Sequence, residues 1–234
     1  SLKTGVYGRT LHRLFIVKPQ ESSAYASLTI TAVLVTYNPD LKDLANSVKA
    51  IALQVNYVVL VDNGSLTDIN KWSKSLRLDK IQVIRLHTNK GISAAQNIGI
   101  QHAIKYCSDF VLLLDQDSIP HINMVESLVI AHCQLTKQGH RISAIGPRYI
   151  DKTSRYSTNF LQIGRFGIHT VSCGNDDEFI QVDLLIASGS LIGIQSLLDI
   201  GGMDEGLFID HVDVEWIFRA RLKGYRAWVH CQAT

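Results

Sequence analysis

Residues 110–117, FVLLLDQD, decide the fold, because five apolar residues run directly into two carboxylates at positions i and i+2. An uninterrupted apolar run of this length is typical of a strand that is buried on both faces of a parallel sheet. We therefore predict a strand from Phe110 to Leu114, with Asp115 and Asp117 in a polar loop at its carboxyl end.

The segments before this strand repeat a pattern of strand, polar loop and helix. The predicted strands are 28–36, 57–61 and 81–86, and the helical spacings that follow them cover 41–51, 69–76 and 92–105. Such alternation predicts a Rossmann-like α/β fold, an open, twisted, mostly parallel sheet with helices on both faces. Ligands bind such sheets at the carboxyl ends of the strands, so the polar loops are expected to share one functional edge.

The second half of the chain has a weaker pattern. The predicted elements are a helix near 124–136, strands near 142–145 and 179–185, a turn and short strand within 187–193, a helix from near 196 and a last clear helix at 212–223. The irregular stretch 148–178 fits an acceptor-binding region better than a second domain. We predict an N-terminal extension over residues 1–27 and one domain over residues 28–234.

The composition is that of a globular chain, with 234 residues of which 46% are hydrophobic and 19% charged. A net charge of +2 gives no basic stripe for nucleic acid, which we exclude as a partner. No apolar stretch reaches the roughly 20 residues of a membrane helix and no signal peptide is evident. We expect a cytoplasmic protein and leave open peripheral contact with the inner face of the plasma membrane.

The cysteines are widely spaced and contain no C-x-x-C pair, so they suggest neither a disulfide framework nor a zinc site. They are Cys107, Cys133, Cys173 and Cys231. We expect buried free thiols in a reducing compartment.

Asp115 and Asp117 suit a hard divalent cation. Two carboxylates just past a buried strand can bind Mg²⁺ or Mn²⁺ and leave the remaining coordination sites to the oxygens of a diphosphate. A solvated turn that caps the next helix is the alternative, because Ser118 and Pro120 also fit a helix start. The D-x-D spacing alone leaves both interpretations open.

Asp62 ends another strand at the same predicted edge. Its carboxylate can accept the imide N–H of a pyrimidine base, and Tyr37 can stack on the ring. Turn formation before Gly64 is the alternative interpretation of Asp62. The edge that both residues share with the Asp pair favours a nucleotide site.

Residues 89–99 place small side chains and the amides of Asn89 and Asn97 at the start of a helix. Gly91 and its neighbours would let backbone N–H groups approach an anionic ligand. Close packing of the helix on the sheet explains the same small residues equally well.

Residues 204–216 concentrate five carboxylates within an apolar and aromatic framework. A carboxylate held at a helix start beside apolar groups can act as a general base. Helix capping is the alternative role for Asp210 or Asp213. His211 is more often structural in such a position, and we leave it out of the catalytic set.

Six motifs, taken in order, resemble glycosyltransferase family 2, and most of all its bacterial rhamnosyltransferase branch. The motifs are Thr36-Tyr37-Asn38-Pro39, Val61-Asp62-Asn63-Gly64-Ser65, Asn89-Lys90-Gly91-Ile92 with Asn97 and Gly99, Asp115-Gln116-Asp117-Ser118, Ala187-Ser188-Gly189-Ser190 and 208–216 (FIDHVDVEW). The resemblance covers about residues 29 to 230. It implies a GT-A fold, an inverting mechanism, a nucleotide-sugar donor and a divalent metal.

The resemblance also implies roles for single residues. Tyr37 and Asp62 would contact the base, Asp115 the ribose or diphosphate, and Asp117 the metal. The catalytic base would be Asp213; Val212 stands where the first acid of the family's pair often lies, which leaves Asp210 as a weaker candidate. The predicted nucleotide-sugar site is completed by Thr36, Asn38, Asn89, Gly91 and Asn97.

The implied reaction is transfer of a sugar from a nucleoside diphosphate, with dTDP-rhamnose favoured, to a saccharide or lipid-linked saccharide in bacterial surface polysaccharide assembly. Family members usually continue past a segment like 224–234 and supply a histidine to the metal site, so we expect ligands or acceptor elements beyond residue 234.

Three alternative functions would require other sequence features. A sugar nucleotidyltransferase should carry a Gly-rich basic loop after its first strand, and residues 36–40 contain neither glycine nor a basic residue. A dinucleotide oxidoreductase needs G-x-G-x-x-G at the same place. A noncatalytic nucleotide-sugar or carbohydrate-binding module would not need a carboxylate pair at a metal and a third carboxylate near the acceptor.

Overall fold

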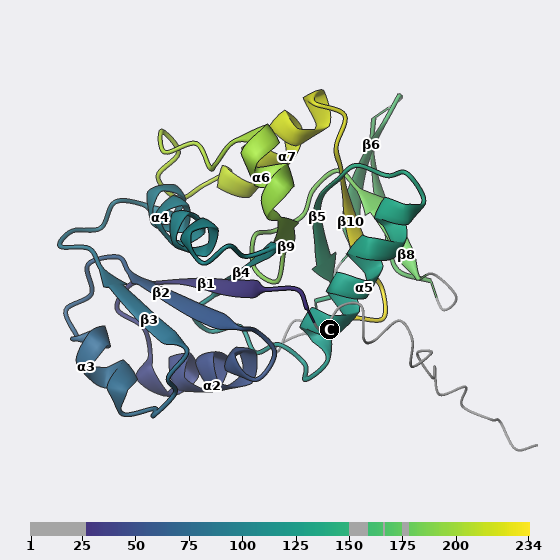
Figure 1. The fold of residues 1–234 in the computed structure, drawn as a ribbon. Coiled ribbons are helices and arrows are strands. Elements are labelled where there is room, and N and C mark those ends of the chain that lie inside the picture. The colour runs from purple at the N-terminus through teal and green to yellow at the C-terminus, as the bar shows by residue number, and fades with distance from the viewer. Residues whose placement is uncertain (1–26, 150–158, 166, 175–177) are drawn as a thin grey trace, which may run out of the picture.

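The computed structural model describes residues 27–149, 159–165, 167–174 and 178–234. An eight-stranded sheet forms its centre (Figure 1). In spatial order its strands are β3 (Ile81–Arg85), β2 (Tyr57–Asp62), β1 (Ile30–Thr36), β4 (Phe110–Asp115), β9 (Leu191–Gly193), β5 (Ile142–Pro147), β10 (Arg226–His230) and β8 (Phe179–Val182). Most of the predicted N-terminal extension, residues 1–26, lies outside the described residues.

The sheet is mostly parallel, as predicted. Strands β3, β2, β1 and β4 pair in parallel, and β5 pairs in parallel with β10. Strand β9 runs antiparallel to both β4 and β5, and β8 runs antiparallel to β10. The parallel strands therefore present their carboxyl ends at one edge.

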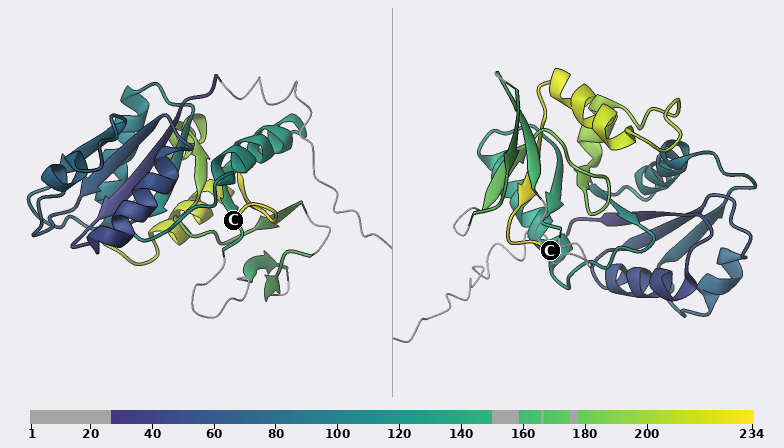
Figure 2. Two further views of the ribbon diagram at one scale, coloured as in Figure 1. Left: turned by 90° about the horizontal axis from the view of Figure 1, so that it is seen from below. Right: turned by 180° about the vertical axis from the view of Figure 1, so that it is seen from behind.

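Helices cover both faces of the sheet, and each face has its own core. The first core contains α2 (Leu41–Ala52), α3 (Ile69–Lys74) and α5 (Met124–Lys137), and the second contains α4 (Ile92–Lys105), α6 (Ile194–Ile200) and α7 (Val212–Leu222). Figure 1 shows α2 and α3 below the sheet and α4, α6 and α7 above it, and Figure 2 shows the same layers from two other sides.

Side chains of the central strands alternate between the two cores. Leu34 and Leu60 pack into the first core, while Val33 and Val59 pack into the second. Because successive strand side chains point to opposite faces, apolar residues at every position satisfy both layers. This burial on two sides explains why the continuous apolar runs predicted the parallel strands correctly.

Two predictions about the second half of the chain were wrong. The stretch predicted as irregular contains an antiparallel hairpin of β6 (Phe160–Gly164) and β7 (Gly167–Val171). The last element is not the helix at 212–223, because β10 follows it and pairs with β5 and β8 inside the sheet. Strand β10 has only five residues with Arg226 and His230 at its ends, so its sequence lacks the apolar run that marks the other central strands.

The prediction of four free thiols was also wrong, because Cys173 and Cys231 form a disulfide. Their Cα atoms lie 5.5 Å apart although 58 positions separate them in the sequence. Cys231 directly follows β10, and its N–H donates to the carbonyl of Glu178 just before β8. The two cysteines meet only in the folded chain, which their spacing in the sequence cannot indicate. Cys107 and Cys133 are free, but Cys107 is exposed rather than buried.

None of the helices in the described part of the chain has the length and apolar character of a membrane span.

Candidate active site

The carboxyl ends of β1, β2 and β4 bring the predicted nucleotide and metal residues to one edge. Thr36 stands opposite Asp62 in the β1–β2 register, and Val35 stands opposite Asp115 in the β1–β4 register. The backbone N–H of Tyr37 donates to Oε1 of Gln116 at 3.0 Å, which joins the loops after β1 and β4. The Tyr37 side chain is about half exposed, at 48%.

Asp62 is fully buried at the end of β2. Its Oδ1 accepts the N–H of Ser65 at 2.9 Å, and the guanidinium Nε of Arg85 lies 3.8 Å from its Oδ2. Within the described residues, neither Asp62 Oδ2 nor the neighbouring Thr36 Oγ1 has a hydrogen-bond partner, although both atoms are buried. Buried polar atoms are normally paired, so this corner of the edge retains capacity to bind a polar ligand group.

Asn38 has a structural role in the same corner. Its backbone adopts a left-handed conformation with φ of 43°. Its N–H donates to Ser65 Oγ at 3.0 Å, and its Oδ1 accepts the N–H of Leu66 at 2.9 Å. These bonds fasten the loop after β1 to the loop after β2.

Asp115 and Asp117 line a hollow of about 840 Å³ at the same edge. The N–H of Asp115 donates to Ser188 Oγ at 3.0 Å, and the hydroxyls of Ser188 and Ser118 are hydrogen-bonded at 2.9 Å. Desolvation raises the pKa of the Asp115 carboxyl, and the negative charges of Asp117 and Asp213 raise this pKa further. The three carboxylates are therefore close enough to interact.

The Asp115–Asp117 pair fits a divalent cation. Two carboxylates that repel each other are stabilised when a cation offsets their charge. In the described residues no three His, Cys, Asp or Glu side chains form a metal-holding cluster. Mg²⁺ commonly uses one or two protein carboxylates together with waters and substrate phosphates, so the pair supplies what such a site requires.

Asp213 lies at the start of α7. Its Oδ2 accepts the N–H of Ala187 at 3.3 Å, which aligns the carboxylate with the segment that precedes β9. Two other acidic residues of the segment are placed differently: Asp210 is exposed, and Glu205 binds Asn97. Only Asp213 among these three is in the group of interacting carboxylates.

Helix α7 is held in place by side chains near Asp213. The Nε of Arg219 donates to Glu215 Oε1 at 2.7 Å, and one of its terminal nitrogens donates to the carbonyl of Gly202 at 2.8 Å. The Trp216 indole N–H donates to the carbonyl of Gly201 at 2.8 Å. These bonds fix the position of α7, and with it the backbone that carries Asp213.

Arg148 and Tyr149, which directly follow β5, were not predicted from the sequence. Both line the hollow of Asp115. Tyr149 also lines a second hollow of about 250 Å³ together with Asp213 and Phe160, whose ring centroid is 5.8 Å from that of Tyr149. Burial raises the pKa of the Tyr149 hydroxyl, and the charges of Asp213 and Asp115 raise it further. Their position after a parallel strand was the signal that could have indicated them.

Asn89 and Gly91 lie in a tightly packed loop before α4. Asn89 Oδ1 accepts the N–H of Gly91 and the side-chain amide of Asn63, both at 2.9 Å. The first N–H of the helix, at Ile92, donates to the carbonyl of Phe208 at 2.7 Å. Gly91 has φ of +87°, and a Cβ there would lie 2.5 Å from the Phe208 oxygen. The structure thus favours close packing over anion binding for this segment.

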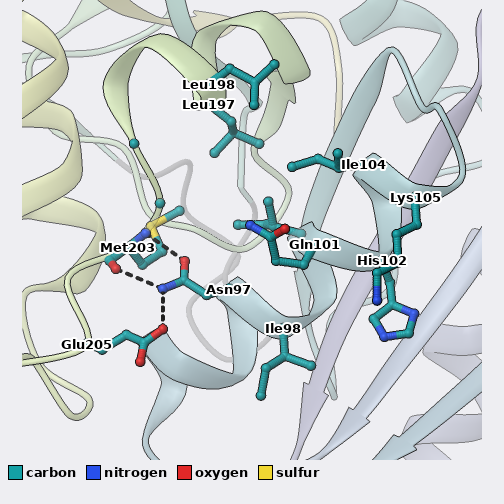
Figure 3. Close-up of a pocket in the computed structure, with 13 residues that line it drawn as sticks. Asn97, Ile98, Gln101, His102, Ile104, Lys105, Leu197, Leu198, Met203 and Glu205 are labelled. Carbon is teal, nitrogen blue, oxygen red and sulfur yellow. Dashed lines mark hydrogen bonds between the residues drawn. The ribbon is translucent and has the colours of Figure 1, made fainter.

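Asn97 is not brought to the hollow of Asp115. Figure 3 shows it in another hollow, of about 660 Å³, where its amide faces Met203 and Glu205. Its Nδ2 donates to the Met203 carbonyl and to Glu205 Oε1, both at 2.9 Å, and its Oδ1 accepts the Met203 N–H at 2.8 Å. The amide is used to hold the loop between α6 and α7.

Comparison with known protein families identifies the chain. The family model described as glycosyl transferase family 2 matches residues 31–173. The chain belongs to this family. Asp62 and Asp115, at the ends of β2 and β4, lie within the matched residues, and Asp213 lies beyond them. Membership of this family argues against the nucleotidyltransferase and oxidoreductase alternatives.

Two curated relatives of this family 2 glycosyltransferase are similar over most of its length. The dTDP-rhamnosyl transferase RfbF of Shigella flexneri is 32% identical over 191 residues, which are 81% of this chain and 62% of that protein. The low-salt glycan biosynthesis hexosyltransferase Agl10 of Haloferax volcanii is 24% identical over 203 residues, 82% of this chain and 61% of that protein. The chain spans about three fifths of the length of these relatives.

Solved structures confirm the GT-A type of fold. The structure of GalNAc-T7 with UDP, GalNAc and Mn²⁺ has a TM-score of 0.70 at 17% identity, over 88% of this chain and 42% of that chain. The structure of S. aureus TarS 1–349 in complex with UDP-GlcNAc has a TM-score of 0.61 at 18% identity, over 88% and 56%. At these identities the likeness shows the fold alone.

Proposed function

We propose that this glycosyltransferase moves a hexose from a nucleoside diphosphate donor to a hydroxyl of a saccharide or lipid-linked saccharide, with inversion at the anomeric carbon. The observation that carries the proposal is that Asp115 and Asp117 line one hollow and Asp213 lines a second, and that Tyr149 belongs to the lining of both. Rhamnose from dTDP-rhamnose is the leading donor, which the name of the Shigella relative supports.

The donor's base would bind between the ends of β1 and β2. Asp62 Oδ2 and Thr36 Oγ1 are buried there without hydrogen bonds from the described residues. A carboxylate oxygen accepts the imide N–H that thymine and uracil share, and a threonine hydroxyl can either donate to or accept from a base. The half-exposed ring of Tyr37 borders the same loop and would stack on the base.

Asp115 and Asp117 would hold Mg²⁺ or Mn²⁺. When bound, the cation would supply positive charge that stabilises the departing diphosphate. The protein's part is to keep both carboxylates at the end of β4, where the bond from the Asp115 N–H to Ser188 fixes the loop. The mutual repulsion of these carboxylates favours a bound cation over an empty pair.

Asp213 would take the proton of the acceptor hydroxyl. An alcohol is a weak nucleophile at neutral pH, so a base must remove its proton as the oxygen attacks the anomeric carbon. Attack from the face opposite the departing nucleotide inverts the configuration at this carbon. Asp213 borders the hollow beside Tyr149 and Phe160, and the aromatic wall of this hollow suits the apolar face of an acceptor sugar.

The test is turnover by Asp213→Asn, with Asp210→Asn as the matched control three residues earlier. The Asn side chain keeps the shape and removes the basicity, so turnover should fall by about 10² to 10⁴. Binding of dTDP in Mn²⁺ should remain that of the wild type, because the base does not contact the nucleotide. Near-normal transfer by Asp213→Asn, or an equal loss in Asp210→Asn, would remove Asp213 from this role.

A further inference from the structure

The hollow that contains Asp115 and Asp117 has one strongly basic side chain among the described residues that line it, which is Arg148. Arg148 directly follows Pro147, the last residue of β5. Its backbone N–H donates to the carbonyl of Ala233 at 2.8 Å, so the main chain at this position is fastened to the segment after β10.

The guanidinium of Arg148 differs from those of the arginines that form ion pairs in the described part of the chain. Its Nε is buried, and no described residue accepts a hydrogen bond from it. The ion pairs within the described part of the chain involve Arg85, Arg141, Arg219 and Arg221 but not Arg148. A buried N–H without a partner is unfavourable, and more so when it belongs to a charged group.

The charges around the hollow indicate what Arg148 would bind. Among the described residues, the lining carries two carboxylates and one strongly basic side chain. A divalent cation would offset the two carboxylates but leave the charge of a diphosphate largely uncompensated. A guanidinium has five donors in a planar fork that matches phosphate oxygens.

We infer that Arg148 binds the diphosphate of the donor from the β5 side of the hollow, opposite the Asp pair at the end of β4. This inference rests on the proposed function. In the transfer, the bond from the acceptor oxygen to the anomeric carbon forms while the bond from that carbon to the phosphate oxygen breaks. The electron pair of the broken bond stays on the phosphate oxygen, and the acceptor proton goes to Asp213.

Arg148 therefore acts more strongly on the transition state than on the bound donor. The phosphate oxygen gains negative charge as the sugar leaves, and a fixed positive charge beside it stabilises that change. Loss of Arg148 should lower the affinity for the free nucleoside diphosphate and also lower kcat.

The test measures binding of dTDP and of thymidine, each with Mn²⁺, to the wild type, Arg148→Gln and Arg148→Lys. Arg148→Gln should weaken dTDP binding by about 10- to 100-fold, the range for hydrogen bonds to a charged group, and leave thymidine binding unchanged. Arg148→Lys keeps the charge without the fork and should give an intermediate loss. Arg77→Gln removes the same charge from an exposed position in the loop before β3 and should match the wild type.

Three results would overturn the inference. The first is an unchanged dTDP affinity in Arg148→Gln with a raised KM for the acceptor, which would assign the residue to a phosphate of the acceptor. The second is an equal loss for dTDP and thymidine, which would make the role structural. The third is a wild type that does not bind dTDP with Mn²⁺, which would overturn the proposed donor as well.

Discussion

Substitution of Asn97 distinguishes most clearly between a structural role and a nucleotide-binding role for a predicted site residue. Asn97→Ala removes three hydrogen bonds to the loop between α6 and α7, two of them to the backbone of Met203 and one to Glu205. Met203 is buried, so its N–H and carbonyl both lose the side-chain partner that holds them. At about 1 kcal/mol for each bond, the substitution should lower the free energy of unfolding by about 3 kcal/mol.

For a chain of this size, that loss corresponds to a fall in Tm of about 6–12 °C. The assay is thermal unfolding by circular dichroism, combined with calorimetric titration of dTDP in Mn²⁺ on the same preparations. Asn97→Asp is the matched variant. It keeps an acceptor for the Met203 N–H but turns its second oxygen toward the Met203 carbonyl and the Glu205 carboxylate, so it should be at least as destabilising near pH 7.

The affinity for dTDP should stay that of the wild type in both variants, provided that it is measured well below the lowered Tm. The opposite pattern, an unchanged Tm with a many-fold loss of dTDP affinity, would refute this reasoning. It would return Asn97 to the nucleotide-sugar site in which the sequence pattern placed it.

Three further predictions concern the site and the disulfide. Asp117→Ala should reduce dTDP affinity in Mn²⁺ to the value measured with a chelator and leave the far-ultraviolet circular dichroism unchanged; undiminished affinity would contradict the metal role. Because the folded-state pKa of Asp115 is raised, stability is lost as the pH rises through that pKa. Asp115→Asn removes this destabilising charge, so its Tm at pH 7 should equal or exceed that of the wild type, while donor binding is impaired. A clear fall in Tm would show that the Asp115 charge does not destabilise the fold. Reduction of the Cys173–Cys231 disulfide should lower stability by about 2–4 kcal/mol, so identical melts with and without reductant would show that the bond contributes nothing.

The sequence predicted correctly those helices and strands whose pattern of apolar and polar residues matches their burial in the fold. Helix α4 runs from Ile92 to Lys105, as predicted, because a strand and a polar loop bound a long helical spacing. Strands β1, β2 and β4 were predicted because both of their faces are buried. Strand β10 was missed because its position inside the sheet depends on pairing with β5 and β8, which no local pattern encodes.

The candidate site likewise contains residues that the sequence predicted and residues that it did not. Asp62 and Asp115 end predicted strands, so their shared edge followed from topology. Asn97 lies on a correctly predicted helix, but the loop that occupies its amide comes from residues more than 100 positions later. Arg148 and Tyr149 follow β5 but belong to no recognised motif. Their relevance depends on which side chains surround them in space.

The most direct test of the account is a calorimetric titration of the wild type with dTDP, once with Mn²⁺ and once with a chelator, and with GDP in Mn²⁺ for comparison. We predict that dTDP binds in Mn²⁺, that the chelator strongly weakens this binding, and that GDP binds less tightly than dTDP. Equal dTDP affinity with and without metal, or tighter binding of GDP, would contradict it.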